Sequence, residues 1–229
     1  MLLREDGDAV VCIGQPAHAW LSGQIARSWA LDPVEPWEEV CLAAEQHDVG
    51  MADWDAAPEL NSETGLPYSF IEMPLATHLK LWTAAPGKLL AQSRYAALLV
   101  SMHGTALYEK RDLSRLTDEQ AAAVQRYLAD QGALQARLST GLEHVERNQR
   151  LIWIWDFLSL ALCLRWDGRS IEDIEVRDGT IEPWPFRGDS VTLRTEGRRL
   201  EGRYEREEEM REALARSPWM ELRFELARG

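Results

Sequence analysis

The sequence predicts a mainly α-helical fold, a helical bundle with a small antiparallel β layer, from three observations. Apolar residues recur at helical spacing through most of residues 16–166. A strand–turn–strand pattern with "DGD" at the turn occupies residues 1–14, and alternating segments with D-G and E-G turns fill residues 170–229. We therefore expect the N-terminal hairpin and the C-terminal strands to share one sheet. Residues 1–229 are expected to form a single domain, with 16–166 as its helical core and the two β-rich ends as an appendage.

The helical core is expected to hold six helices. The first follows Pro16, which suits the first turn of a helix. The others are expected at about 38–48, 75–84, 86–109, 117–147 and 150–165. Thr117 and Gln120 form a capping box. Residues 50–74 carry several glycines, prolines and aromatic residues, and are expected to be a long ordered loop of the kind that often serves function. A short charged helix is expected at 205–216.

Composition excludes several classes of partner. The chain has 229 residues, is 45% hydrophobic and carries a formal net charge of -13. Duplex nucleic acid and anionic membranes need basic surfaces, so neither is expected as a partner. The longest apolar run, residues 151–164, is too short to span a bilayer. Three separated cysteines and the absence of a signal-peptide pattern favour a cytoplasmic location. A small-molecule substrate is expected, and a homodimer is left open.

Six polar residues lie in apolar helical surroundings and need an explanation: His18, His47, Asp48, His78, His103 and Asp156. Asp156 is the clearest case, because it stands in a helix that is apolar on every side and therefore expected to be buried. A buried carboxylate needs a cationic partner, and no Arg or Lys lies within one helical turn of it. A metal ion is favoured over a distant basic side chain. A lone histidine in such a helix is more often a hydrogen-bonded core residue, but helical bundles do build metal sites from inward side chains on facing helices.

The adjacent pair His47–Asp48 predicts a site with two metals. Neighbouring helix residues point about 100° apart, so the two side chains do not share one direction, but a carboxylate has two oxygens and is able to bridge. We expect the first metal to be held by His18, His47, Asp48 and Asp156. We expect the second to be held by Asp48, His78 and His103. Imidazole and carboxylate ligands without thiolate favour two divalent transition metals, with iron first and manganese or other divalent ions as alternatives.

The order of these residues, H…HD…H…H…D, resembles the HD-domain metalloprotein superfamily. The stretch "AAEQHDVG" is similar to the second-helix signature of that superfamily, and the resemblance covers about residues 16–166. It implies a bundle of about five core helices around one or two metals, and the extra His78 and His103 imply a dinuclear site. More narrowly, "QPAHAWLSGQIA", "EQHDVGMADWD", "LPYSFIEMP" and "HLKLW" resemble an uncharacterised bacterial domain-of-unknown-function family within that superfamily.

The resemblance implies three functional hypotheses. The first is a dinuclear-metal-dependent hydrolase of a small phosphoester or nucleotide-like substrate, since hydrolases dominate the superfamily. The second is a mixed-valent diiron oxygenase acting on a small hydroxylated or phosphonate substrate. The third is a non-catalytic metal-binding module. Many superfamily members carry a lysine just after H-D-x-G where this chain has Met51, which weakens a specific prediction of phosphate binding. The cyclic-dinucleotide phosphodiesterases carry a double histidine and a G-Y-P motif; here His103 is followed by Gly104 and no G-Y-P occurs, which lowers the odds of that activity.

Further residues are expected around this site. Asp48 and Gln24 are candidate catalytic residues, Gln24 because it lies near the face of the helix that carries His18 and could orient water or substrate. The candidate substrate-binding residues are Trp54, Tyr68, Ser69 and Arg27. The first three lie in the aromatic loop. Arg27 is suited to contact a phosphate, but a surface salt bridge is its more common role.

Overall fold

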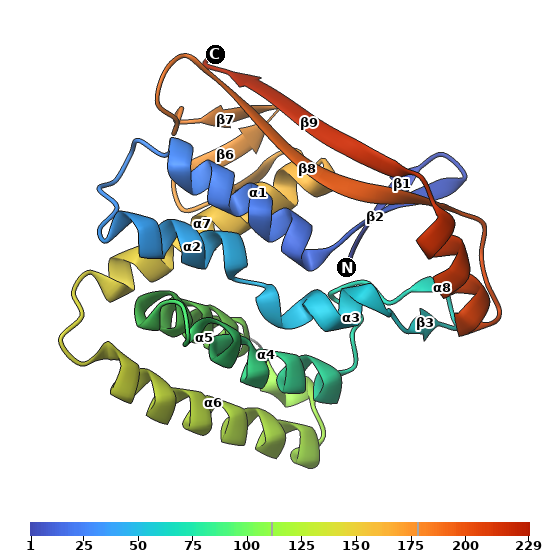
Figure 1. Cartoon of the computed structure of the whole chain (residues 1–229), viewed down its shortest axis with the longest axis horizontal. Coiled ribbons are helices and arrows are strands. Elements are labelled where there is room, and N and C mark those ends of the chain that lie inside the picture. Colours follow the sequence, from blue (N-terminus) through green and yellow to red (C-terminus); the bar gives the residue numbers. More distant parts are fainter. Residues whose placement is uncertain (111, 178) are drawn as a thin grey trace.

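A helical body carries an antiparallel sheet on one side in the computed structural model (Figure 1), which describes residues 1–110, 112–177 and 179–229. The helices are α1 (Gln15–Ser28), α2 (Trp37–Gln46), α3 (Ala52–Ala56), α4 (Leu75–Leu89), α5 (Arg94–Glu109), α6 (Asp118–Ser139), α7 (Val145–Leu164) and α8 (Glu207–Arg216), with short 3-10 turns η1 (Val49–Met51) and η2 (Leu113–Arg115). The strands are β1 (Leu2–Asp6), β2 (Ala9–Ile13), β3 (Leu60–Asn61), β4 (Leu66–Pro67), β5 (Arg169–Ile171), β6 (Ile174–Arg177), β7 (Thr180–Glu182), β8 (Ser190–Glu201) and β9 (Trp219–Ala227). The expected mainly α fold with a small β layer is confirmed.

The two ends of the chain form one four-stranded antiparallel sheet, in the order β1-β2-β8-β9. The turn between β1 and β2 uses Gly7 at φ +64°, a conformation that glycine adopts without strain. β2 pairs with β8 through the register Ala9↔Glu201. The predicted sharing of one sheet by the hairpin and the C-terminal strands is therefore confirmed. The strands β5, β6 and β7 form a separate three-stranded sheet that the sequence pattern did not distinguish.

Helix boundaries differ from the expected ones at two places. Pro86 lies inside the last turn of α4 and does not begin a new helix, because Ala85, Pro86 and Leu89 are buried there and their packing compensates for the backbone hydrogen bond that proline removes. α5 begins at Arg94, where the Ser93 side chain accepts a hydrogen bond from the backbone N–H of Ala96. The helix expected at 117–147 begins with the predicted capping box but ends at Ser139.

The segment 50–74 holds more regular structure than expected, since it contains part of η1, all of α3 and the small β3–β4 hairpin. Gly50 explains how this segment reaches the bundle. A Cβ at this position would lie 2.7 Å from the carbonyl oxygen of Leu81, so only glycine allows η1 to pack directly on α4. The expectation of one continuous irregular loop was wrong, because local helical and hairpin contacts form within it.

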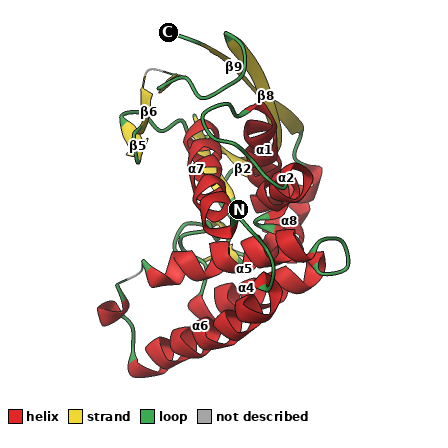
Figure 2. Cartoon of the chain, turned by 90° about the vertical axis from the view of Figure 1, so that its left-hand side faces the viewer, coloured by secondary structure: helices red, strands yellow, loops and turns green. Residues whose placement is uncertain are grey.

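The packing of the helices decides where polar residues meet. α1 packs on α2 and α7, and α5 packs on α2, α4, α6 and α7. Figure 2 shows α1, α2 and α7 lying between the β8–β9 strands and the α4–α6 layer. One large apolar cluster runs through these layers, with Trp155, Leu99 and Ile25 among its fully buried members. None of the described helices has the length and apolar character needed to cross a membrane.

Candidate metal centre

Five of the six predicted ligands converge between α1, α2, α5 and α7. His18 Nε2 lies 2.6 Å from Asp48 Oδ2, and His47 Nε2 lies 3.4 Å from Asp156 Oδ1. His103 Nε2 lies 3.6 Å from the other oxygen of Asp156. The three histidines and Asp48 are buried, and Asp156 keeps 13% of its side chain exposed. Four separate helices thus bring their polar residues to one point inside the bundle.

The end of α2 explains how His47 and Asp48 serve one centre. α2 ends at Gln46, His47 still has helical backbone angles, and Asp48 has left the helix with φ −101° and ψ 18°. The two side chains are therefore not held 100° apart as they would be within a helix. His47 Nε2 lies 3.6 Å from Asp48 Oδ2. The break at this helix end turns both donor groups toward the same point.

Hydrogen bonds at the far side of two rings orient them as metal ligands. His18 Nδ1–H donates to Ser159 Oγ at 2.9 Å, and the Ser159 hydroxyl donates to the carbonyl oxygen of Asp156. His47 Nδ1–H donates to the carbonyl oxygen of Ala44 at 2.8 Å. In each neutral ring the lone pair is then on Nε2, which faces the carboxylates. Sequence reasoning missed Ser159, although a serine three residues after Asp156 in an apolar helix was a usable signal.

The charges in the cluster depend on one another. Burial alone would lower the pKa of His47, but the carboxylates of Asp48 and Asp156 outweigh it and raise that pKa to about 9. The imidazoles in turn hold the pKa values of both carboxyl groups below their usual range against the effect of burial. Burial, and next the charge on His47, lower the pKa of His103 to about 4. Among the described residues, no Lys or Arg lies within 4.0 Å of either carboxylate. Only imidazolium balances them, and a metal ion would replace its proton.

The donor atoms suit one divalent ion. They form two groups, His18–His47–Asp48 and His47–His103–Asp156, and within each group all ligand atoms lie within 4.8 Å of one another. His47 Nε2 belongs to both groups, is buried and has no hydrogen-bond partner. One ring nitrogen has one lone pair and binds one metal. The residues present therefore fit a single ion held by the set expected for the first metal, with His103 beside it.

The ligands expected for the second metal, Asp48, His78 and His103, do not form one group of donor atoms among the described residues. His78 on α4 accepts a hydrogen bond at Nε2 from the indole N–H of Trp82 at 3.0 Å, and its Nδ1 is hydrogen-bonded to the Tyr108 hydroxyl. The ring of Trp82 lies 5.7 Å from that of His103 and 6.1 Å from that of His78, so it stands next to both histidines. His78 is directed to this aromatic pair because Trp82 follows it by one helical turn.

A cavity of about 370 Å³ opens over the cluster. The polar residues on its wall are Gln15, His18, Asp48, His78, His103 and Asp156. The apolar residues on its wall are Phe70, Ile71, Met73, Trp82, Leu107 and Leu160. Ile71 has 79% of its surface exposed. No Lys or Arg of the described residues lines this cavity.

The comparisons with known proteins give one match. The family model "Protein of unknown function (DUF3891)" matches residues 1–202, which include the sheet up to β8 and every residue of the cluster. The chain belongs to the DUF3891 family. No curated protein and no solved structure matches it. The expected domain-of-unknown-function family is thereby confirmed, whereas membership of this DUF3891 chain in the HD-domain superfamily stays a prediction.

The loop residues predicted to bind substrate are not the ones that reach the cavity of this DUF3891 chain. Trp54 is buried on α3, Tyr68 packs against the apolar core, and Ser69 donates to Glu72 at 2.6 Å. None of the three lines the cavity. The chain turns after Ser69, and the residues of this segment that line the cavity are Phe70, Ile71 and Met73.

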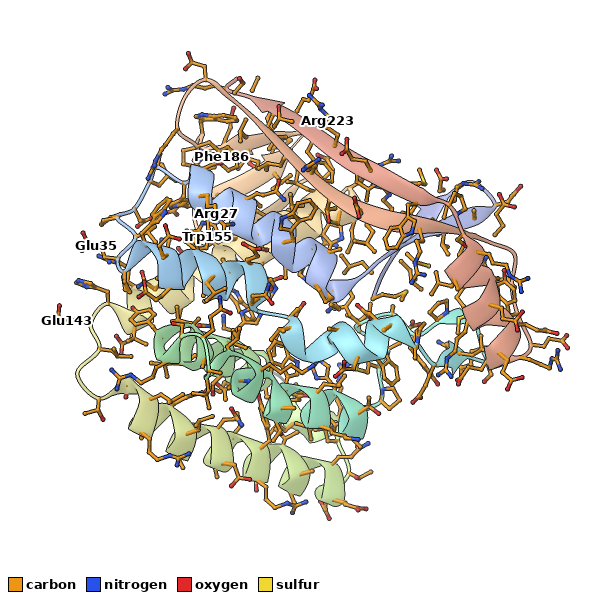
Figure 3. All side chains as sticks on the ribbon, viewed as in Figure 1. Arg27, Glu35, Glu143, Trp155, Phe186 and Arg223 are labelled. Atoms are coloured by element: carbon orange, nitrogen blue, oxygen red, sulfur yellow. The ribbon has the colours of Figure 1, made fainter. Side chains whose placement is uncertain are left out.

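Gln24 and Arg27 also lie away from the cluster. The Gln24 amide donates to the backbone carbonyl of Arg194 at 2.8 Å and accepts from its N–H at 3.1 Å, so it joins α1 to β8. The structure thus places Gln24 at the β layer and not at the cluster, since β8 uses both polar atoms of its amide. Arg27, labelled in Figure 3, pairs with Glu45 on α2 at 2.5 Å. Arg27 of this DUF3891 chain therefore forms the surface salt bridge expected as its more common role, and it does not line the cavity.

Proposed function

We propose that this protein is a metal-dependent hydrolase of the HD type that cleaves a small phosphoester or nucleotide-like substrate. The observation that supports it most is the set of buried histidine and carboxylate donors on the floor of a cavity, with His47 Nε2 buried and unpartnered. The order of these residues along the chain supports the same proposal. The absence of a lysine at Met51 leaves the recognition of phosphate to the metal centre.

The first metal is assigned to His18, His47, Asp48 and Asp156. A second ion would need Asp48, His103 and His78, and His78 would have to exchange its contacts with Trp82 and Tyr108. When bound, divalent ions supply a water of lowered pKa and the positive charge that stabilises both the attacking and the leaving oxygens. Iron or manganese suits these ligands.

The chain's own residues orient and enclose the reactants. Ser159 and the carbonyl oxygen of Ala44 hold the Nδ1 protons of His18 and His47, so both rings keep their orientation when substrate binds. The apolar wall formed by Met73, Leu107 and Leu160 excludes water and accommodates the uncharged part of the substrate. Asp48 belongs to both expected ligand sets and would be a ligand of a second ion as well.

A second candidate is a diiron oxygenase acting on a small hydroxylated or phosphonate substrate. It is supported by the apolar character of the cavity wall and by the lack of Lys or Arg among the described residues that line it. In this alternative the metal centre would supply O₂ activation, and the same histidines and carboxylates would hold it.

Metal content, turnover and spectroscopy test the proposal together. We expect the purified protein to contain at least one divalent transition metal per chain and to hydrolyse bis(p-nitrophenyl) phosphate. His47→Ala is expected to lose the metal and to lower turnover by more than about 100-fold, since even changes around metal ligands cost 10–100-fold. His144→Asn is the matched control, because His144 is exposed on the surface beside Glu35.

The other outcomes separate the alternatives. A mixed-valent diiron EPR signal with O₂ consumption and no hydrolysis would overturn the hydrolase and support the oxygenase. Bound metal without turnover of either kind would support a non-catalytic metal-binding module. Protein that contains no metal in any preparation would overturn the metal centre itself. His78→Ala tests the second ion, because a dinuclear enzyme should keep one metal and lose the other.

A further inference from the structure

A second cleft lies at the C-terminal end of α7, under β9. It has a volume of about 580 Å³, and we call it the α7–β9 cleft, defined by Arg4, Leu162, Arg165, Val176, Leu222 and Phe224. Figure 1 shows β6, β7 and the end of α7 lying below β8 and β9. The α7–β9 cleft shares no lining residue with the metal cavity. Leu162 and Arg165 follow Asp156 by six and nine residues, about 9–14 Å along the helix axis.

Arg4 is a buried charge beside this cleft, and within the described part of the chain it has no ion pair. Its side chain is 8% exposed, and its one hydrogen bond runs from Nη1 to the carbonyl oxygen of Cys163 at 3.5 Å. Nε is buried without a partner, and Nη2 has no hydrogen bond to any described residue. No carboxylate of the described residues lies within 4.0 Å of this guanidinium. Since arginine stays protonated in proteins, Arg4 is a buried cation that no carboxylate of the described residues contacts.

The surroundings of Arg4 add positive charge. Burial, and next the charge on Arg165, lower the pKa of Arg4. The neighbouring thiol supplies no negative charge, because burial raises the pKa of Cys163 to about 12. Arg165 itself is exposed at the rim, where it ends α7 with φ +54°, a backbone conformation that glycine usually takes at this position.

Three acidic residues line the cleft, Asp167, Glu221 and Glu225, and the last two pair with arginines other than Arg4 and Arg165. Glu221 pairs with Arg194 at 3.4 Å, and Glu225 pairs with Arg223 at 3.0 Å. Arg223 is labelled on β9 in Figure 3. The two rim carboxylates thus have cationic partners of their own on the outer side of the sheet.

We propose that the α7–β9 cleft binds a small organic anion that joins one carboxylate to an apolar body. The Nε–Nη2 edge of Arg4 is the unsatisfied edge of the guanidinium fork, which matches the two oxygens of a carboxylate. Arg165 at the rim supplies the second positive group. Leu162, Val176 and Leu222 form the apolar floor that receives the rest of the ligand. A volume of about 580 Å³ is in the range of small-molecule sites.

Calorimetric titration with octanoate tests the proposal on the full-length protein. We expect octanoate to bind with one site per chain, and 1-octanol and acetate to bind at least tenfold more weakly, because each lacks half of the recognised chemistry. Arg4→Met and Arg165→Ala should each weaken octanoate binding at least tenfold. Arg165 is exposed, so its variant is expected to fold even where a change at Arg4 perturbs packing.

Two control variants locate the binding. Arg216→Ala removes an exposed arginine of α8 that does not line the cleft, and octanoate affinity should stay within twofold. His47→Ala should also leave it within twofold, which separates this site from carboxylate binding at the metal centre. Equal binding of octanoate and 1-octanol, or wild-type affinity in both arginine variants, would overturn the proposal. Binding of inorganic phosphate without octanoate would overturn the assigned ligand class.

Discussion

The two cavities along α7 differ in whether the charge buried beside them has a partner of opposite charge. At the middle of the helix, Asp156 lies within 3.8 Å of nitrogens of three histidines, so the chain itself supplies the compensating charge. At the C-terminal end, the buried guanidinium of Arg4 has no carboxylate within 4.0 Å among the described residues. A compensated cluster is able to exchange a proton for a metal ion. An uncompensated cation gains most from an added anion.

This difference separates the energetic roles of the two sites. A buried charge with partners stabilises the fold only as part of its group, and removal of one member leaves the others unpaired. A buried charge without partners costs free energy in the empty protein, and that cost is recovered when ligand binds. Variants at the two sites should therefore change stability in opposite directions.

The largest effect is expected for Asp156→Asn. The change leaves the imidazolium of His47 with one counter-charge fewer, and the free energy of unfolding of the metal-free protein should fall by roughly 3–5 kcal/mol. Urea denaturation measures it. Asp53→Asn is the control, because that carboxylate is 84% exposed and pairs with Lys88 on the surface, so its loss should stay below about 1 kcal/mol. An equal decrease in the free energy of unfolding in both variants would contradict the inference that Asp156 compensates the charge of the histidine cluster.

The metal-free cluster should also make stability depend on pH. The pKa of His47 is raised to about 9 from 6.5, so its contribution is fully present below pH 6.5 and is lost as pH rises toward 9. The shift corresponds to roughly 3 kcal/mol. The pKa of His103 is lowered to about 4, so stability also falls between pH 6.5 and 4, where only the unfolded imidazole takes up a proton.

Thermal unfolding in EDTA between pH 4 and 9 checks this dependence. Wild-type protein should be most stable near pH 6.5. His47→Gln should remove the loss on the alkaline side and make the acidic limb shallower, because the charge on His47 helps to lower the pKa of His103. An alkaline limb that is unchanged in His47→Gln would show that another group controls it.

A smaller effect is expected at the wall of the metal cavity. A Cβ at Gly104 would lie 2.5 Å from the ring of Trp82 and 2.6 Å from the Tyr127 hydroxyl, so Gly104→Ala should lower the free energy of unfolding by about 1–3 kcal/mol. Gly132→Ala on α6 is the control. Apart from its chain neighbours and the backbone of its own helix, no described atom lies within 4 Å of a Cβ there, and alanine in a helix should raise stability by about 0.5–1 kcal/mol. A loss in both variants would contradict the packing argument.

The smallest effect, with the opposite sign, is expected for Arg4→Met without ligand. Replacing an unpaired buried cation by an apolar side chain of similar length should leave the free energy of unfolding unchanged or raise it by up to about 1 kcal/mol. Arg199→Met removes a paired arginine of β8 that contacts Asp6 at 2.7 Å and should lower stability slightly. Chemical denaturation compares them. A large loss in Arg4→Met would mean that the Cys163 carbonyl contact stabilises the fold.

Much of the fold could be predicted from local patterns. The hairpin at Gly7, the capping box at Thr117 and the alternation of the C-terminal strands each depend on neighbouring residues, and the structure contains all three. The boundary at Pro86 could not be predicted, because burial of that helix turn depends on packing partners far away in the sequence.

In the candidate site, too, some features could be predicted from local sequence and others depend on long-range packing. The residue types of the cluster stood out, because each polar side chain interrupts an apolar helix. The contacts of Gln24 and His78 could not be predicted, because sequence spacing gives the face of a helix but not the element that covers that face. Gln24 faces β8, and His78 faces the ring of Trp82 and the hydroxyl of Tyr108.

The sequence by itself determined the helical body, the β ends and the residue types able to hold a metal, because periodicity and burial of polar groups are local properties. Only the tertiary structure decided which donors share one centre and which residues of the 50–74 segment line its cavity. It also placed Arg4 and Arg165, 161 positions apart, beside one cleft. Those distances are set by long-range packing of α7 against the sheet, which no local pattern encodes.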